Sequence, residues 1–191
     1  MYAFLLSFGV IFVAELGDKS QLMAMTLASR YKPLPILAGI TVATAGVHAL
    51  SVLFGVLAGR SLPTNWITLI AGIAFLGFAA WTLRGDELTE DDEAAVARAR
   101  RSAFVTALIV FFIAEVGDKT MLATITLATR ENLFGTWLGS TVGMVAADAL
   151  AIGIGALLGR RLPERAIRIG ASALFVIFGA LLIIEAVRAL T

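Results

Sequence analysis

The strongest constraint on this fold is that the second half of the sequence repeats the first at a spacing of 100 residues. The match needs no gap and covers charged, glycine and proline positions alike. The matching positions include Glu15 and Glu115, Gly17 and Gly117, Asp18 and Asp118, Lys19 and Lys119, Ser20 and Thr120, Gly39 and Gly139, Gly59-Arg60 and Gly159-Arg160, and Leu62-Pro63 and Leu162-Pro163. A single register across most of both halves indicates an internal duplication, so the chain is expected to contain two copies of one structural unit.

The apolar content of the chain predicts that this unit lies in a lipid bilayer. Hydrophobic residues make up 59% of the sequence, whereas soluble domains average about 45–50%. Six apolar segments are each close to the roughly 20 residues that a membrane-spanning helix needs. They are about Tyr2–Ser29, Leu34–Ala58, Trp66–Leu83, Ala103–Thr129, Phe134–Leu158 and Ala166–Val187. The predicted fold is therefore all-α, a polytopic membrane protein with six transmembrane helices.

Each copy of the repeat contains three of these spans, which determines how the copies are related. We expect residues 1–83 to form the first three-helix repeat, 84–102 a charged loop, and 103–191 the second repeat. Because three is odd, the second repeat enters the membrane from the opposite side and the two repeats are inverted. Inverted repeats are typical of secondary transporters, whose substrate site lies near the bilayer midplane between the repeats.

The distribution of Lys and Arg predicts the orientation in the membrane. The loops after the first, third and fifth spans hold ten of the fifteen basic residues, the other side holds three, and two lie inside spans. The positive-inside rule therefore predicts that the central loop is cytoplasmic and that both termini lie outside. The expected location is the cell (inner) membrane, with lipid as the solvent of the spans.

The charged residues of the repeated motif lie inside predicted spans and so require a physical reason. Six such charges are present, and each costs roughly 2.5–3.5 kcal/mol at the bilayer centre, or roughly 15–20 kcal/mol together. This cost exceeds a typical folding stability of about 5–15 kcal/mol. The six charges are Glu15, Asp18, Lys19, Glu115, Asp118 and Lys119. They are therefore expected to pair, to be neutralised or to line water.

The spacing within the motif predicts how these charges are arranged. In a continuous helix, Glu15 would share one face with Asp18 and Lys19, three and four residues further on. Gly17 lies between the acids and weakens the helix at that point. The first span would also be about 42 Å long as one helix, which exceeds the roughly 30 Å of a bilayer core. Either a tilt of the whole span or a break near the motif is expected.

The two motifs together supply ligands for a hard divalent cation. Four carboxylates and two ammonium groups sum to −4 + 2 = −2, which balances one such ion. Oxygen ligands suit Mg²⁺, Ca²⁺ and Mn²⁺ better than softer metals. The candidate ligands are Glu15, Asp18, Glu115, Asp118, Ser20, Thr120 and Gln21, with Lys19, Lys119 and Asp148 expected to balance charge or couple protons. The alternative is that each Glu–Lys pair is a structural bridge, but this explains poorly why the whole motif recurs.

Several polar and small residues outside the motif have simpler expected roles. His48 and Asp148 occupy equivalent positions, and either could relay protons, add a metal ligand or be held by hydrogen bonds within the bundle. Glu185 is expected to reach the surface beside Arg188. Glycines spaced four apart are expected to pack helices; they are Gly135, Gly139 and Gly143, Gly55 and Gly59, and Gly155 and Gly159.

Other function classes are disfavoured by composition. A net charge of +1 provides no electrostatic basis for a nucleic-acid partner. The absence of Cys and the presence of a single His exclude thiolate sites and His-rich zinc or iron sites. A membrane enzyme would be expected to show a His cluster, a Cys or a Ser–His arrangement. No permanently bound cofactor is expected.

The doubled motif Glu-x-Gly-Asp-Lys-(Ser/Thr), at residues 15–20 and 115–120, resembles the signature of the Golgi-type calcium/manganese–proton exchangers and their bacterial manganese-exporting relatives. The resemblance extends over the whole chain. It implies a divalent cation/proton antiporter whose ion site is built from the acids of both motifs, carrying Mn²⁺ or Ca²⁺. A cation channel, or an exporter of another small solute on the same plan, remains the alternative. The oligomeric state stays open.

Overall fold

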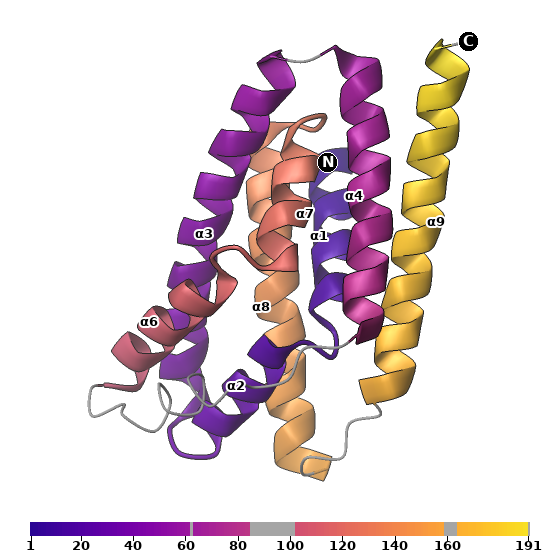
Figure 1. Ribbon diagram of the computed structural model, residues 1–191. Helices are drawn as coiled ribbons and strands as arrows, with labels where there is room; N and C mark the ends of the chain where they lie inside the picture. Colours follow the sequence, from indigo (N-terminus) through magenta and orange to yellow (C-terminus); the bar gives the residue numbers. More distant parts are fainter. Residues whose placement is uncertain (62, 85–101, 159–163, 191) are drawn as a thin grey trace.

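The computed structural model describes residues 1–61, 63–84, 102–158 and 164–190, and these residues form helices joined by short turns (Figure 1). The helices are α1 (Tyr2–Glu15), α2 (Lys19–Ala28), α3 (Pro33–Ser61), α4 (Thr64–Arg84), α6 (Ala103–Glu115), α7 (Lys119–Ala128), α8 (Leu133–Leu158) and α9 (Glu164–Leu190). The predicted central loop lies almost wholly outside the described residues. The all-α prediction is confirmed for the part of the chain that the structure describes.

Four of these helices, α3, α4, α8 and α9, are long and apolar enough to cross a membrane, and α1 and α6 are shorter apolar helices. Large apolar side chains are exposed along them, among them Leu53, Phe54, Ile73, Ile113, Ile177 and Leu181. Exposed apolar surface on this scale indicates contact with lipid rather than with water. The chain is therefore a membrane protein.

The first and fourth predicted spans are each broken into two helices at the motif. Gly17 has a φ of +77° and Gly117 a φ of +84°, a left-handed conformation that a residue with a Cβ rarely adopts. Helix α1 ends at Glu15, and α2 begins only after Asp18. The expectation that Glu15, Asp18 and Lys19 share one continuous helix face is therefore wrong, and the expected break is confirmed.

The two halves of the chain pack through exchanged partners. Helix α1 of the first half lies against α8 of the second, α6 of the second half lies against α3 of the first, and α4 pairs with α9 (Figure 1). Exchanging the halves turns the α1–α8 contact into the α6–α3 contact and leaves the α4–α9 pair unchanged. The repeat that is visible in the sequence is thus matched by a repeat in the packing.

Glycines make the two equivalent contacts possible. Gly39 on α3 faces the backbone of Phe104 on α6, and a Cβ at Gly39 would lie 2.5 Å from the Phe104 carbonyl oxygen. Gly139 on α8 faces the carbonyl oxygen of Phe4 on α1 just as closely. The packing role expected of Gly139 is thus confirmed, and Gly39, for which no such prediction was made, packs in the same way, as small residues do in membranes. Gly159 lies outside the described residues.

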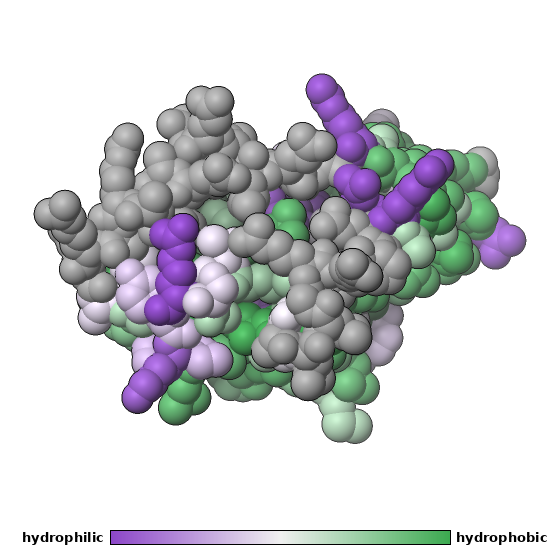
Figure 2. Space-filling model, turned by 90° about the horizontal axis from the view of Figure 1, so that it is seen from below, coloured by the Kyte–Doolittle hydropathy of each residue, from purple (hydrophilic) through white to green (hydrophobic). Residues whose placement is uncertain are grey.

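The two ends of the helix bundle differ in what they carry. Both chain termini lie at the same end, which is the upper end in Figure 1. At the other end, seen from below in Figure 2, hydrophilic side chains project beyond a hydrophobic surface. The described basic residues there are Arg30, Lys32, Arg84, Arg165 and Arg168, and those at the terminal end are Arg60, Arg130 and Arg188. The described part of the chain thus keeps the direction of the predicted charge bias.

An apolar cluster fills the half of the bundle away from the termini. Helices α2, α3 and α6 contribute most of its residues. We call it the inner cluster; its members are Met23, Ala24, Leu27, Ile36, Ile40, Ala43, Ala107, Val110, Phe111 and Ile152. This cluster closes one side of the region where the two helix breaks lie.

Candidate ion site

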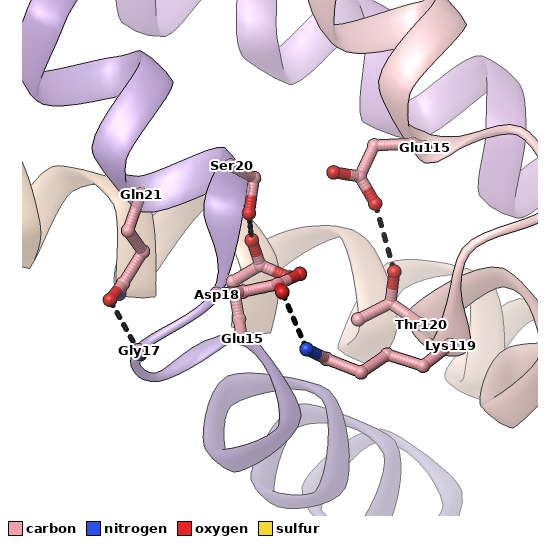
Figure 3. A network of polar contacts seen from close by, with 8 residues as sticks. All are labelled: Glu15, Gly17, Asp18, Ser20, Gln21, Glu115, Lys119 and Thr120. Atoms are coloured by element: carbon pink, nitrogen blue, oxygen red, sulfur yellow. Dashed lines mark hydrogen bonds and ion pairs between the residues drawn. The ribbon is translucent and has the colours of Figure 1, made fainter. Parts of the chain in front are cut away.

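The two copies of the motif meet in the middle of the structure. The Lys119 Nζ atom, at the start of α7, lies 2.5 Å from Oδ1 of Asp18, which precedes α2. Both side chains are buried, and Figure 3 shows the lysine reaching across from the second half to the first. The residues are 101 positions apart, so this ion pair joins the two repeats rather than stabilising one of them.

A hydroxyl group holds each glutamate across the break of its own span. Ser20 Oγ donates to Glu15 Oε1, and Thr120 Oγ1 donates to Glu115 Oε2 over 2.9 Å (Figure 3). The second oxygen of each glutamate is buried without a hydrogen-bond partner among the described residues. Each carboxylate is thus fixed in position by one oxygen, while the other can take a proton or a cation.

The residue after the hydroxyl caps the break, and its identity differs between the copies. In the first copy the Gln21 side-chain oxygen accepts from Gly17 N over 2.8 Å, and Gln21 Nε2 donates to Ala147 O over 3.0 Å. In the second copy the Met121 sulfur accepts from Gly117 N over 3.1 Å. The Gln21 oxygen therefore accepts one hydrogen bond from the backbone in this structure, which leaves one lone pair of this oxygen for a metal.

Asp148 and His48 occupy equivalent positions but differ in their surroundings. Asp148 on α8 is fully buried, and neither of its oxygens has a hydrogen-bond partner among the described residues. It follows Ala147, to which Gln21 is bonded, and lies close enough to feel the charge of Asp18. His48 Nδ1 lies 3.5 Å from Thr141 Oγ1, which agrees with a histidine held within the bundle. Asp148 belongs to the electrostatic surroundings of the motif.

The charges of the site are distributed unequally. The Lys119 ammonium interacts electrostatically with Asp18, Asp118 and Glu15, whereas Lys19 is only half-buried. The Glu15 carboxyl group lies within electrostatic range of the acids Glu115, Asp18 and Asp148. The acids of both halves therefore form one cluster, and Lys119 of the second half is a cation placed within it.

This cluster is not arranged as a finished coordination sphere. Within the described ranges, no three Asp, Glu or His side chains lie close enough together to hold one metal ion. A metal bound by carboxylates of both motifs therefore requires these side chains to move toward one another. The Lys119 side chain, which engages Asp18, is the group that such a movement would have to displace.

One ion pair near the terminal end was not predicted from the sequence. Glu185 on α9 pairs with Arg130, which follows α7, at 2.7 Å. The glutamate side chain is 58% exposed, so it does reach toward the surface. Residues 55 positions apart give no pattern in a sequence that would have identified this contact.

The sequence profile of the family described as "Divalent cation/proton antiporter GDT1" matches residues 3–90 and 103–190, the greater part of both halves. The chain belongs to this family. It is 37% identical over 175 residues to the "Putative manganese exporter" of Vibrio cholerae, covering 90% of this chain and 86% of that protein.

Further relatives extend the similarity to photosynthetic organisms. The chain is 32% identical over 187 residues to the GDT1-like protein sll0615 of Synechocystis, covering 88% of this chain and 90% of that protein. It is 30% identical over 210 residues to the chloroplastic protein PAM71 of Arabidopsis thaliana, covering 95% of this chain and 56% of that protein. No solved structure gives a significant match. The family resemblance seen in the doubled motif is thereby confirmed.

Proposed function

We propose that this protein exports Mn²⁺ from the cytoplasm in exchange for protons, with Ca²⁺ as the alternative substrate. The family supports a divalent cation and a proton as the exchanged ions, and the Vibrio cholerae relative is named for manganese. The observation that carries the proposal is the buried Lys119–Asp18 pair, because it joins a residue of one copy of the motif to a residue of the other and so supports a shared site.

The substrate ion binds between carboxylates of both motifs. Its ligands are drawn from Glu15, Asp18, Glu115 and Asp118, with the hydroxyls of Ser20 and Thr120 and the amide of Gln21 as additional oxygen donors. Lys119 acts as a tethered cation that occupies Asp18 until the metal replaces it. Lys19 adds a second positive charge at the edge of the cluster, and Asp148 receives or donates protons.

Competition for the same oxygens couples the metal to protons. A protonated carboxylate is a poor ligand, so metal binding requires proton release and protonation expels the metal. The buried glutamate oxygens that lack a hydrogen-bond partner among the described residues are the atoms at which this exchange takes place. A proton gradient can then drive the metal outward.

Alternating access follows from six spans arranged as two inverted three-helix repeats, residues 1–83 and 103–191. The exchanged packing of α1 on α8 and α6 on α3 supports this architecture. The central loop is cytoplasmic and both termini face outward, in the inner membrane. The chain has no Cys, so a single introduced cysteine reports the orientation. A cysteine at position 95 should not react with an impermeant thiol reagent added to intact cells. Reaction there would show that the orientation is the opposite of the one proposed.

Transport by the purified protein in liposomes tests the function. Mn²⁺ or Ca²⁺ movement should follow the sign and size of an imposed pH gradient while the membrane voltage is clamped, and protons should move in the opposite direction. Metal movement that ignores the gradient would indicate a channel or uniporter. Failure of both metals to move would favour an exporter of another solute.

A further inference from the structure

The half of the bundle between the carboxylates and the chain termini contains buried hydroxyl groups that no described group satisfies. Ser7 on α1, Thr124 on α7, and Thr136 and Ser140 on α8 are all fully buried. None of their hydroxyl oxygens has a hydrogen-bond partner among the described residues. Leaving a buried hydroxyl unsatisfied is unfavourable, and ordered water is its usual partner where protein groups are missing.

Each of these hydroxyls lies on a helix row that leads to an acid of the site. On α1, Ser7 lies two turns before Glu15 on the same face, a distance of about 12 Å along the axis. On α7, Thr124 lies one turn beyond Thr120, which bonds Glu115. The rows therefore lead toward the carboxylates, with the buried Ile11 between Ser7 and Glu15 on α1 and the buried Met144 before Asp148 on α8.

The row on α8 reaches furthest toward the termini. Thr136 lies in the first turn of the helix, and Ser140 lies one turn further along. Asp148 follows Ser140 by eight residues, about 12 Å along the helix axis. Because Gly139 packs on Phe4 and Gly143 on Phe8, Ser140 lies at the same level of the bundle as Ser7.

The equivalent positions of the other repeat are apolar. Shifting each hydroxyl by 100 residues gives an alanine or isoleucine that is also fully buried. The pairs are Ser7 and Ala107, Thr124 and Ala24, Thr136 and Ile36, and Ser140 and Ile40. All four apolar partners belong to the inner cluster. At these four pairs of positions the duplicated scaffold thus places a hydroxyl in one repeat and hydrocarbon in the other.

We infer that Ser7, Thr124, Thr136 and Ser140 line a water-filled path by which protons pass between the terminal end of the bundle and the carboxylates. The inference rests on the proposed proton exchange and assigns its route. Hydroxyl groups serve such a path because each one both donates and accepts a hydrogen bond, and so can join a chain of water molecules. The four equivalent positions in the inner cluster are hydrocarbon and give water no such partners.

The test replaces hydroxyls by groups of similar volume. Thr136→Val and Ser140→Ala should slow proton-coupled Mn²⁺ transport in liposomes by about tenfold or more when combined, while Mn²⁺ affinity of the purified protein stays unchanged. Raising the proton concentration on the terminal side should recover part of the rate. The matched controls are Thr68→Val and Ser172→Ala, which remove buried hydroxyls already bonded to backbone carbonyls elsewhere in the bundle.

Several outcomes would overturn the path. Rates equal to those of the controls would show that the hydroxyls carry no protons, and an equal loss of Mn²⁺ affinity would place them in the ion site instead. These results would leave the proposed function intact, since wild-type transport is measured in the same liposomes. Wild-type transport whose rate and direction do not depend on the pH gradient would contradict both the proposed function and the proton path.

A second measurement detects water without depending on transport. In the metal-free purified protein, Ser140→Cys should react with a charged methanethiosulfonate about tenfold faster than Ile40→Cys, because the thiolate that reacts forms only where water reaches it. The two positions are equivalent in the repeat and equally buried. Equal rates would contradict a hydrated path on one side only.

Discussion

The two copies of the motif share a backbone but not an electrostatic role. Both are broken at a left-handed glycine, and both hold their glutamate by a hydroxyl across the break. Yet Lys119 is buried against Asp18, while the equivalent Lys19 is half-buried. Equivalent residues of the duplicated framework therefore have different surroundings once the two halves are packed together.

The largest expected effect is the loss of transport when the glutamate of either motif is replaced, and it should be equal for the two copies. Glu15→Gln and Glu115→Gln should each lower Mn²⁺ transport by more than about 100-fold, because each removes a charge and a protonation site from one shared cluster. Transport into liposomes measures the loss, and size-exclusion profiles in detergent show whether folding is preserved. Full activity in either variant would show that the copies work separately.

Replacing the lysine should have different effects in the two copies of the motif. Lys119→Gln should lower transport by about tenfold or more and lower the melting temperature in detergent, because removing one partner of a buried ion pair leaves an uncompensated charge. Lys19→Gln should change both quantities little. The matched double variant Asp18→Asn with Lys119→Gln should recover stability relative to Lys119→Gln alone. Equal effects of the two single lysine changes would contradict the asymmetry.

Helix packing should again be equal in the two halves. Gly39→Ala and Gly139→Ala each add a Cβ against the backbone of the equivalent phenylalanine, Phe104 or Phe4, and should destabilise the protein by about 1–3 kcal/mol. Thermal unfolding in detergent measures both. Gly9→Ala is the control, because its added Cβ meets nothing within 4 Å. A large difference in stability between Gly39→Ala and Gly139→Ala would contradict equal packing in the two halves.

The smallest effect concerns the capping residues Gln21 and Met121. Gln21→Met would keep an acceptor for Gly17 N but lose the bond to Ala147 O, and one side chain–backbone hydrogen bond contributes about 1 kcal/mol. We expect a reduction of transport by a few fold, whereas Met121→Gln should be nearly neutral. Transport assays on both variants decide this, and equal losses would show that Gln21 has no special role beside Asp148.

The features that could be predicted from the sequence are those that depend on one residue and its neighbours in the chain. The glycine between the two acids predicts a weak point, and the structure ends α1 at Glu15 and resumes at Lys19. Glycines at four-residue spacing predict close helix contacts, and Gly55 and Gly139 make them. Such features depend on backbone sterics near one residue, which a pattern in the chain reveals.

The pairings across the bundle could not be predicted in the same way. Spacing suggested that each glutamate would lie beside the lysine of its own motif, but the break separates them and Lys119 reaches Asp18 instead. The Arg130–Glu185 pair is likewise set by how α7 meets α9. Residues at equivalent positions of a repeat look identical in sequence, so only the packing of the whole chain decides which lysine is buried.

The claim that both motifs form one ion site is tested most directly by counting bound Mn²⁺ on the purified protein. Equilibrium binding should give one ion per chain for the wild type, with protons released as the ion binds. Binding should be lost in Glu15→Gln and in Glu115→Gln alike. Two ions per chain, or undiminished binding in either variant, would contradict a single shared site.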